Sequence, residues 1–581
     1  MNRLLRTALL VAVAVLIPVA VAAATPPGSD TKVTVGSPPS PFSQNKQNEP
    51  AVAVNPIDPT IAAAGVNEEI DEEACNAGDP TTCPFTAGIG TSGIYFSDDS
   101  GSTWMQPTYT GWSARDCLGP DPCTPHVGPI GTLPRYFENG LVSDGDPAVG
   151  FGPQPDANGH FSWSNGWRLY YANLAANFSG GAFKGFEANA VSRLDSQNYA
   201  AAKAGDNNAW MAPVIVTRQN AALFSDHEMV AADDASSSPF FGNVYVCNAA
   251  FRSQERGGLP EPIVVNASSD GGNTWRTTQL SQAVNNGQVG GRQDCAVNTA
   301  SDGTVYVFWD GADGNTGTQA IFMARSFDGG IHFQRPARLV THFVTTGLPD
   351  PESGDLTFDG VAGARDGSFP TVDIANGAPT GAGASDEIVL AWSQGPTPSD
   401  TGGGANEHVQ VLYSTNRGNT WHDGGIASPA GDRPDFPAIA ISPNGQDAYL
   451  TYMNFLQPWQ STTANPRLFQ GVVRHADVAA NGSIGAWSDL NRAPTGDARG
   501  SSANALTDEF LGDYDYAFAT NAFGVAVWND ARNAADCPAI DAYRQSLVDG
   551  TPGTRPAPQQ DCLPNFGNTD IYGGSYTDPT P

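Results

Sequence analysis

The sequence predicts an all-β chain that folds as a seven-bladed β-propeller, with six blades as the alternative. Short apolar runs are separated by turns throughout the chain, which contains 65 glycines and 45 prolines. One short strand recurs seven times, and a turn of fixed pattern recurs four times. Internal repetition of this size is typical of propeller blades.

The recurring strand consists of small and β-branched residues, as the crowded centre of a propeller requires. Its copies begin 66 to 97 residues apart. The two widest spacings leave room for an insertion, which is why six blades remain an alternative. The seven copies begin at Glu49, Asp146, Glu228, Asp294, Phe369, Phe436 and Asp515.

Each recurring strand is followed by a second strand, usually aromatic, as in residues 305–309, and by a third, as in residues 409–413. Three to four antiparallel strands per repeat make one blade. Few segments of the sequence show a helical pattern. The best candidates are residues 200–204 and 539–547, both short and both between strand signals.

A turn of the form Ser-x-Asp-x-Gly-x-Thr-Trp follows the third strand in two repeats, and near matches follow it in two more. We expect the Asp or Asn side chain to accept backbone N–H groups of its own turn, while glycine allows a positive φ and the aromatic ring packs on the blade. The pattern therefore reports fold and not chemistry. The four turns span residues 97–104, 268–275, 326–333 and 414–421.

These turns resemble the Asp boxes, or BNR repeats, of the sialidase-like propeller superfamily. With the inner strands, the resemblance covers about residues 45 to 577 and implies a single propeller there. Residues 1–24 are predicted to be a signal peptide, and residues 25–44 an N-terminal extension. The stretch Lys32-Val-Thr-Val is expected to close the last blade as its outer strand, which removes an open sheet edge.

The N-terminus predicts export, because basic residues precede an apolar run at residues 8–23 and small residues follow. We expect a secreted monomer, extracellular or periplasmic. The net charge of -32 becomes -34 when two arginines leave with the signal peptide. Such a surface repels nucleic acid and anionic membranes, so neither is expected as a partner.

Eight cysteines in an exported chain favour disulfides over a metal site. No two of them stand in a close C-x-x-C spacing, and histidine is scarce, so a zinc site is not expected. Among the many possible connectivities, the spacings favour Cys75–Cys83, Cys117–Cys123, Cys247–Cys295 and Cys537–Cys562.

The starts of the inner strands converge at one mouth of the central channel, where acids, arginines and a tyrosine gather. These are the residue types that glycoside hydrolysis needs. A single acid before a strand more often caps a turn, and a ring of acids can also hold calcium. The catalytic candidates are Asp294, Glu228, Tyr514, Asp146 and His227, and the substrate-binding candidates are Arg292, Arg433, Arg532, Glu49 and Asp435.

The resemblance implies three arginines that hold a carboxylate sugar, a tyrosine nucleophile with a glutamate partner, and an aspartate acid/base. This sequence departs from the pattern, because no arginine stands between Arg6 and Arg115. The sequence therefore predicts a carbohydrate-active propeller, a glycoside hydrolase whose substrate need not be sialic acid and which requires no cofactor. The alternative is a non-catalytic propeller that binds a carbohydrate or glycoconjugate, stabilised by a structural Ca²⁺.

Overall fold

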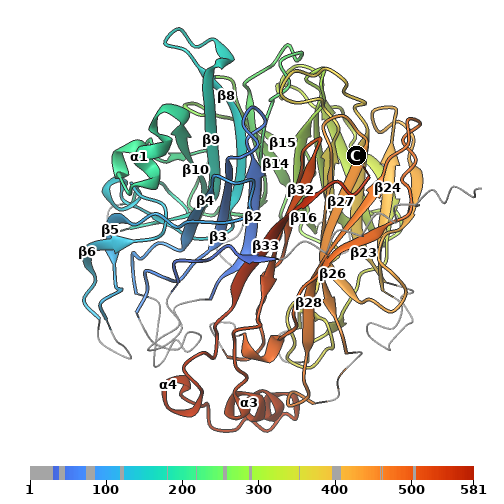
Figure 1. The fold of residues 1–581 in the computed structure, drawn as a ribbon. Helices are drawn as coiled ribbons and strands as arrows, with labels where there is room; N and C mark the ends of the chain where they lie inside the picture. Colours follow the sequence, from blue (N-terminus) through green and yellow to red (C-terminus); the bar gives the residue numbers. More distant parts are fainter. Residues whose placement is uncertain are drawn as a thin grey trace, which may run out of the picture.

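Seven small antiparallel sheets stand around a central axis, which makes the chain a seven-bladed β-propeller (Figure 1). The computed structural model describes residues 30–37, 46–73, 86–117, 123–178, 181–217, 219–252, 258–286, 291–351, 354–395, 407–457, 460, 462–501 and 506–580. The fold confirms the predicted seven blades and excludes the six-bladed alternative.

The innermost strands are rich in alanine and valine because seven backbones crowd around the axis. In blade order they are β2 (Asn48–Val54), β8 (Ala148–Pro155), β12 (Phe224–Ala232), β16 (Arg292–Thr299), β22 (Thr371–Ile374), β26 (Pro434–Ile441) and β31 (Tyr516–Ala519).

The second and third strands follow by antiparallel pairing. The second strands are β3 (Ala62–Asn67), β9 (Phe161–Asn177), β13 (Val244–Phe251), β17 (Val305–Ala312), β23 (Ile388–Gln394), β27 (Asp447–Phe455) and β32 (Phe523–Asp530). The third strands are β4 (Ser92–Ser97), β10 (Ala188–Asp195), β14 (Ile263–Ser268), β18 (Gln319–Ser326), β24 (His408–Ser414), β28 (Leu468–Asp477) and β33 (Asp570–Thr577).

The outer edge differs between blades. In the first blade it is a single bridge from Phe96 to Met105. In the last blade it comes from the N-terminal segment, whose strand β1 pairs with β33. The outer strands are β11 (Val214–Ile215), β15 (Arg276–Gln279), β19 (Arg338–His342), β25 (His422–Ile426), β29 (Ser488–Arg492) and β1 (Thr31–Lys32).

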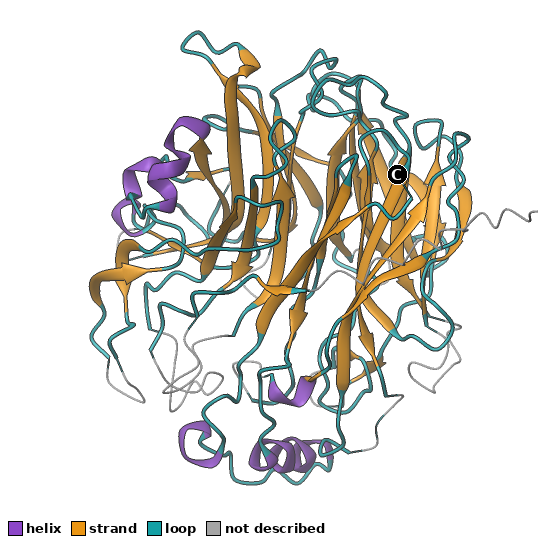
Figure 2. Ribbon diagram, viewed as in Figure 1, coloured by secondary structure: helices purple, strands orange, loops and turns teal. Residues whose placement is uncertain are grey.

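Short elements decorate the blades, and Figure 2 shows how few helices accompany the strands. Helices α1 and α3 occupy the two predicted helical stretches. The additional elements are β5 (Tyr109–Ser113), β6 (His126–Ile130), β7 (Leu141–Ser143), β20 (Leu348–Pro349), β21 (Leu356–Thr357), β30 (Gly496–Asp497), η1 (Phe137–Asn139), η2 (Ser196–Asn198), η3 (Asn207–Ala209), η4 (Ala498–Gly500), α1 (Tyr199–Lys203), α3 (Pro538–Val548) and α4 (Pro558–Asp561). Among the described residues, no helix is long and apolar enough to span a membrane.

The hydrophobic core is divided among the interfaces between neighbouring blades. Between blades four and five, for example, Tyr306 and Phe308 of β17 pack against Leu390 and Trp392 of β23. The aromatic residues of the second strands therefore bury their rings between blades, which fixes the spacing of the sheets around the axis.

Four turns at the ends of β4, β14, β18 and β24, here called the corner turns, form the hydrogen bonds that the sequence predicts. In the turn after β14, Ser268 Oγ accepts the N–H of Gly272 at 2.9 Å, and Asp270 Oδ1 accepts that of Thr274 at 2.9 Å. The third strands run away from the end where the innermost strands begin, so the corner turns lie on the opposite face.

Three predicted disulfides are confirmed, namely Cys117–Cys123, Cys247–Cys295 and Cys537–Cys562. Cys75 and Cys83, the fourth predicted pair, lie outside the described residues. The Cys247–Cys295 bond joins β13 to β16 and therefore ties the third blade to the fourth.

Candidate functional site

A cavity of about 1160 Å³, here called the mouth, opens where the innermost strands begin. Among the described residues that line it, fourteen acids face only three cationic side chains, Lys46, Arg292 and Arg365, together with His227. The acids are Glu49, Glu68, Glu69, Glu72, Asp144, Asp146, Asp226, Glu261, Asp294, Asp310, Asp355, Asp366, Asp508 and Asp513. The mouth is therefore strongly electronegative.

A shared backbone feature places several of these side chains. The strands β2, β12, β16 and β26 each carry a bulge near their first residues. The first bulge residue adopts a left-handed conformation that side chains other than glycine rarely take, and Asp146 before β8 does the same. Such strain clusters at functional sites. The residues and their φ values are Glu49 at 52°, Asp146 at 48°, His227 at 50°, Asp294 at 55° and Phe436 at 49°.

The bulges correct the predicted register of the third blade. The sequence repeat predicts Glu228 at the start of this strand, but His227 occupies the left-handed position that Glu49 and Asp294 hold in their strands. Glu228 is instead buried behind the mouth, where its Oε2 accepts a hydrogen bond from Asn189 Nδ2 at 2.6 Å. Because the repeat consists mostly of small residues, the sequence alone does not show whether its alignment in this blade should move by one residue.

Glu49 and Asp146, from neighbouring blades, form a hydrogen-bonded carboxyl pair. Burial and the nearby charge of Asp513 raise the pKa of Glu49, and burial and Glu49 raise the pKa of Asp146 well above its usual range. Asn67 Nδ2 also donates to Glu49 Oε2 at 2.5 Å. Because two carboxylates in contact cannot both ionise readily, the contact favours a proton shared by this pair.

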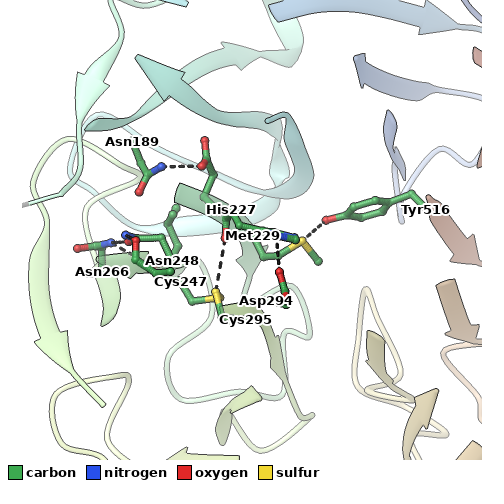
Figure 3. The surroundings of a disulfide bond; sticks show 12 residues. Asn189, His227, Met229, Cys247, Asn248, Asn266, Asp294, Cys295 and Tyr516 are labelled. Carbon is green, nitrogen blue, oxygen red and sulfur yellow. Dashed lines mark hydrogen bonds and ion pairs between the residues drawn. A yellow bond between two sulfur atoms is a disulfide. The ribbon is translucent and has the colours of Figure 1, made fainter. Parts of the chain in front are cut away.

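His227 and Asp294 form an ion pair, with Nδ1 of the imidazole 2.6 Å from Oδ1 of the carboxylate (Figure 3). Burial alone would lower the pKa of His227, but the attraction and hydrogen bond of Asp294 outweigh it and raise that pKa to about 10. Asp310 hydrogen-bonds to Asp294, and burial together with the charge of Asp294 raises the pKa of Asp310 well above its usual range. Of this second carboxyl pair, Asp310 is the member whose surroundings favour the protonated form more strongly.

A third carboxyl pair joins Asp366 to Asp435, whose Oδ1 accepts the N–H of Gly367 at 3.2 Å. Burial raises the pKa of both carboxyls, and the charge of Asp366 adds to the shift at Asp435. Nearby, Arg365 forms an ion pair with Asp513 at 2.8 Å. This arginine already has a carboxylate partner, so it leaves little net positive charge in the mouth.

Aromatic rings complete the wall. The ring of Tyr514 lies 5.0 Å from His227, and the ring of Phe369 lies 5.6 Å from it. Burial and the charges of Asp146, Glu49 and Glu228 raise the pKa of Tyr514 well above its usual range. The phenol therefore stays protonated at neutral pH, and a phenolate nucleophile is unfavourable in this setting.

The structure brings together six of the ten residues predicted for the site. Asp294, Tyr514, Asp146, His227, Arg292 and Glu49 line the mouth. Glu228, Arg433, Arg532 and Asp435 are not among the residues that line it. Arg532 instead forms an ion pair with Asp30 at 2.6 Å, which fastens the N-terminal segment, and Asp435 is hydrogen-bonded to Asp366.

Sequence reasoning missed several lining residues because they do not begin an inner strand. Arg365 lies in the loop after β21, Asp310 lies near the end of β17, and Glu261 precedes β14. Arg365 and Asp366 come a few residues before the innermost strand β22, and this position is the one signal in the sequence that could point to Arg365.

A cation site is not evident among the mouth residues that the structure describes. Where the chain is described, one group of three or more acids or histidines brings its ligand atoms within 4.8 Å of one another, and it consists of Asp447, His475, Asp477 and Asp578, away from the mouth. Calcium in the mouth therefore remains a prediction.

Fold and site together define a seven-bladed β-propeller with an acidic mouth. No family model matches the chain, and no curated protein matches it. Similar solved structures include an α-L-arabinofuranosidase from Fusarium graminearum, with 12% identity, a TM-score of 0.37, and coverage of 74% of this chain and 92% of that one.

Two sialidases are similar to a comparable degree. That of Trypanosoma rangeli has 14% identity and a TM-score of 0.36, and the match covers 70% of this chain and 53% of that chain. A Hadza microbial sialidase has 11% identity and a TM-score of 0.38, with 80% of this chain and 73% of that chain covered. The likeness concerns the fold alone.

Proposed function

We propose that this chain is a secreted, sialidase-like glycoside hydrolase of the Asp-box type, acting at the mouth on a carbohydrate or glycoconjugate. The observation that carries the proposal is the Glu49–Asp146 carboxyl pair, which has raised pKa values and lies in the same cavity as the His227–Asp294 ion pair. Glycosidases use two carboxyl groups in different surroundings, one that keeps its proton and acts as an acid and one that loses its proton and acts as a base or nucleophile.

Asp146 is the proposed proton donor to the leaving oxygen, because it is partly exposed in the mouth while Glu49 behind it is only 3% exposed. Asp294 is the proposed second carboxylate: burial raises its pKa, while the charge of His227 and the hydrogen bond of Asp310 oppose that shift and favour the ionised form. It would activate water or attack the sugar. Tyr514 and Phe369 are proposed to contact the sugar ring, since aromatic faces pack well against it.

The charge of the mouth indicates the substrate class. With fourteen acids lining it and Arg365 already paired with Asp513, an anionic sugar such as sialic acid would be repelled. We therefore propose a neutral or cationic glycan as the substrate.

The test is sugar release by the mature chain from neutral glycosides, amino-sugar oligomers and sialosides. Activity on neutral or amino-sugar substrates should fall at least about 100-fold in Asp146→Asn, the scale of general acid catalysis. The matched control is Asp328→Asn in a corner turn on the opposite face, which should retain activity. Release of sialic acid alone would contradict the substrate class.

A non-catalytic binding propeller is the second candidate. It is favoured by the burial of Glu49, Asp294 and Asp366, each less than 10% exposed. Saturable glycan binding without sugar release, or stabilisation by calcium that depends on the mouth acids, would support it over the hydrolase.

A further inference from the structure

The face opposite the mouth carries a group of side chains, here called the seam cluster, that consists of Asp447, His475, Asp477 and Asp578. One ligand atom of each lies within 4.8 Å of all the others. His475 Nε2 is 3.1 Å from Asp447 Oδ1 and 3.8 Å from Asp578 Oδ1. Asp447 begins β27, His475 and Asp477 end β28, and Asp578 follows β33, so the cluster joins blades six and seven.

The charge of the seam cluster is unbalanced. Three carboxylates face a single imidazole, and among the described residues no lysine or arginine forms an ion pair with Asp447, Asp477 or Asp578. Asp447 and His475 are 6% and 2% exposed, so water screens that half of the cluster poorly. A cation placed between the four ligand atoms would compensate the excess negative charge.

A buried tyrosine gives independent support. Tyr449 is 1% exposed, and its hydroxyl has no hydrogen-bond partner in the described structure. Its ring lies 5.0 Å from that of His475. Tyr449 pairs directly with His475 across β27 and β28, so both side chains lie on the same face of blade six. A buried hydroxyl left without a partner is costly, and a water on a bound ion would supply one.

Blade six also lacks the corner turn at this place. In four other blades the second strand pairs with a serine that organises the turn, as Ile388 pairs with Ser414. In blade six the corresponding residue, opposite Ala448, is Ala476, which has no hydroxyl. The two residues on either side of it, His475 and Asp477, belong to the seam cluster.

We propose that the seam cluster binds a divalent transition metal ion, Zn²⁺ or a related first-row cation, which fastens the C-terminal segment to blade six. One imidazole nitrogen with carboxylate oxygens is a ligand set that suits Zn²⁺. Calcium prefers a shell of oxygens alone. The site lies across the molecule from the mouth and does not depend on the proposed hydrolysis.

The test is titration of the EDTA-treated full chain with Zn²⁺ by calorimetry. We expect one site per chain, an upward shift of the unfolding midpoint, and at least a tenfold loss of affinity in His475→Gln and in Asp578→Asn. The matched control is His332→Gln, since His332 also pairs with an aspartate, Asp328, at 2.7 Å, but in an exposed corner turn without further ligands. This variant should bind Zn²⁺ unchanged.

The unmutated chain provides a second readout that no folding defect can obscure. Co²⁺ should give visible d–d absorption that Zn²⁺ abolishes. The proposal is overturned if neither ion binds, if His332→Gln removes the binding as strongly as His475→Gln, or if Ca²⁺ binds at the cluster in place of Zn²⁺.

Discussion

Nδ1 of His227 lies 2.6 Å from Oδ1 of Asp294, although the two residues belong to different blades and each occupies the left-handed position of a bulge. The left-handed backbone costs of the order of 1–3 kcal/mol at each of the two positions. This conformation turns the two side chains towards each other, so that they can form the ion pair. The two bulges thus bring opposite charges into contact at the inner wall of the mouth.

This ion pair makes stability depend on pH. The pKa of His227 is raised from 6.5 in the unfolded chain to about 10, so its stabilising contribution is complete below pH 6.5 and is lost as the pH rises towards 10. Relative to His227→Gln, the wild type should lose up to roughly 5 kcal/mol of unfolding free energy across this window. Urea denaturation at pH 6 and pH 10 measures it. The control His160→Gln, at an exposed imidazole, should show no such difference, and a flat difference for His227→Gln would refute the charged pair.

The shared proton of Glu49 and Asp146 predicts a shift in the pH dependence of sugar release. Burial and then the charge of Glu49 hold the pKa of Asp146 well above its usual range, so Glu49→Gln removes the largest contribution after burial. If Asp146 must be protonated to act, the alkaline limb of the activity profile should move to lower pH in Glu49→Gln. Initial rates from pH 4 to 9 show this. An unmoved limb would assign the acid to another residue.

The sequence predicted the composition of the mouth better than its geometry. Strand starts identified Glu49, Asp146 and Asp294 because every innermost strand begins at the same end of the propeller. Arg433 and Arg532 also stand near strand ends, but their guanidinium groups do not line the cavity. Where a long side chain points depends on its tertiary partners, as Asp30 shows for Arg532, and a repeat carries no information about them.

The disulfide Cys247–Cys295 should support the site as well as the fold. Cys295 follows Asp294, and its sulfur lies 3.9 Å from the backbone oxygen of His227. Closing a loop of 48 residues stabilises the fold by about 4 kcal/mol, so the Cys247→Ala, Cys295→Ala double variant should lose about that much and also lose activity.

The matched control removes Cys537–Cys562, which closes a loop of 25 residues and does not line the mouth. It should cost about 3.5 kcal/mol and leave activity unchanged. Chemical denaturation and sugar release measured on both double variants separate the two effects. Equal losses of activity would mean that the first disulfide has no specific role at the mouth.

The fold itself was predictable because local and long-range signals agree. Alternating small residues, aromatic second strands and glycine turns each specify the same blade, so an error in one leaves the others intact. In blade six, the sequence pattern of the turn is missing and does not predict the end of the third strand. The turn at Ala476 lacks the serine pattern, yet β28 pairs with β27 at nine residues because tertiary packing holds it there.

The corner turns are predicted to be structural and not functional. In Asp270→Ala the side-chain acceptor for the N–H groups of Asn273 and Thr274 and the hydroxyl of Thr274 is lost. At about 1 kcal/mol per hydrogen bond in a partly exposed turn, the unfolding free energy should fall by about 1–3 kcal/mol. Sugar release should be unchanged, and a loss of activity at a temperature where the variant is folded would contradict this.

Closure of the propeller depends on the N-terminal strand. Thr31 pairs with Gly573 and Lys32 with Tyr572, and Lys32 Nζ lies 2.6 Å from Oδ1 of Asp570, a carboxyl that is 1% exposed. Deleting residues 30–37 exposes the edge of β33 and leaves Asp570 without its cation. We expect a lower unfolding midpoint and self-association, measured by thermal unfolding and light scattering. Lys32→Met keeps the strand and removes the ion pair, so it should destabilise the monomer without causing association. A truncated chain as stable and monomeric as the full one would show that β1 contributes nothing to closure.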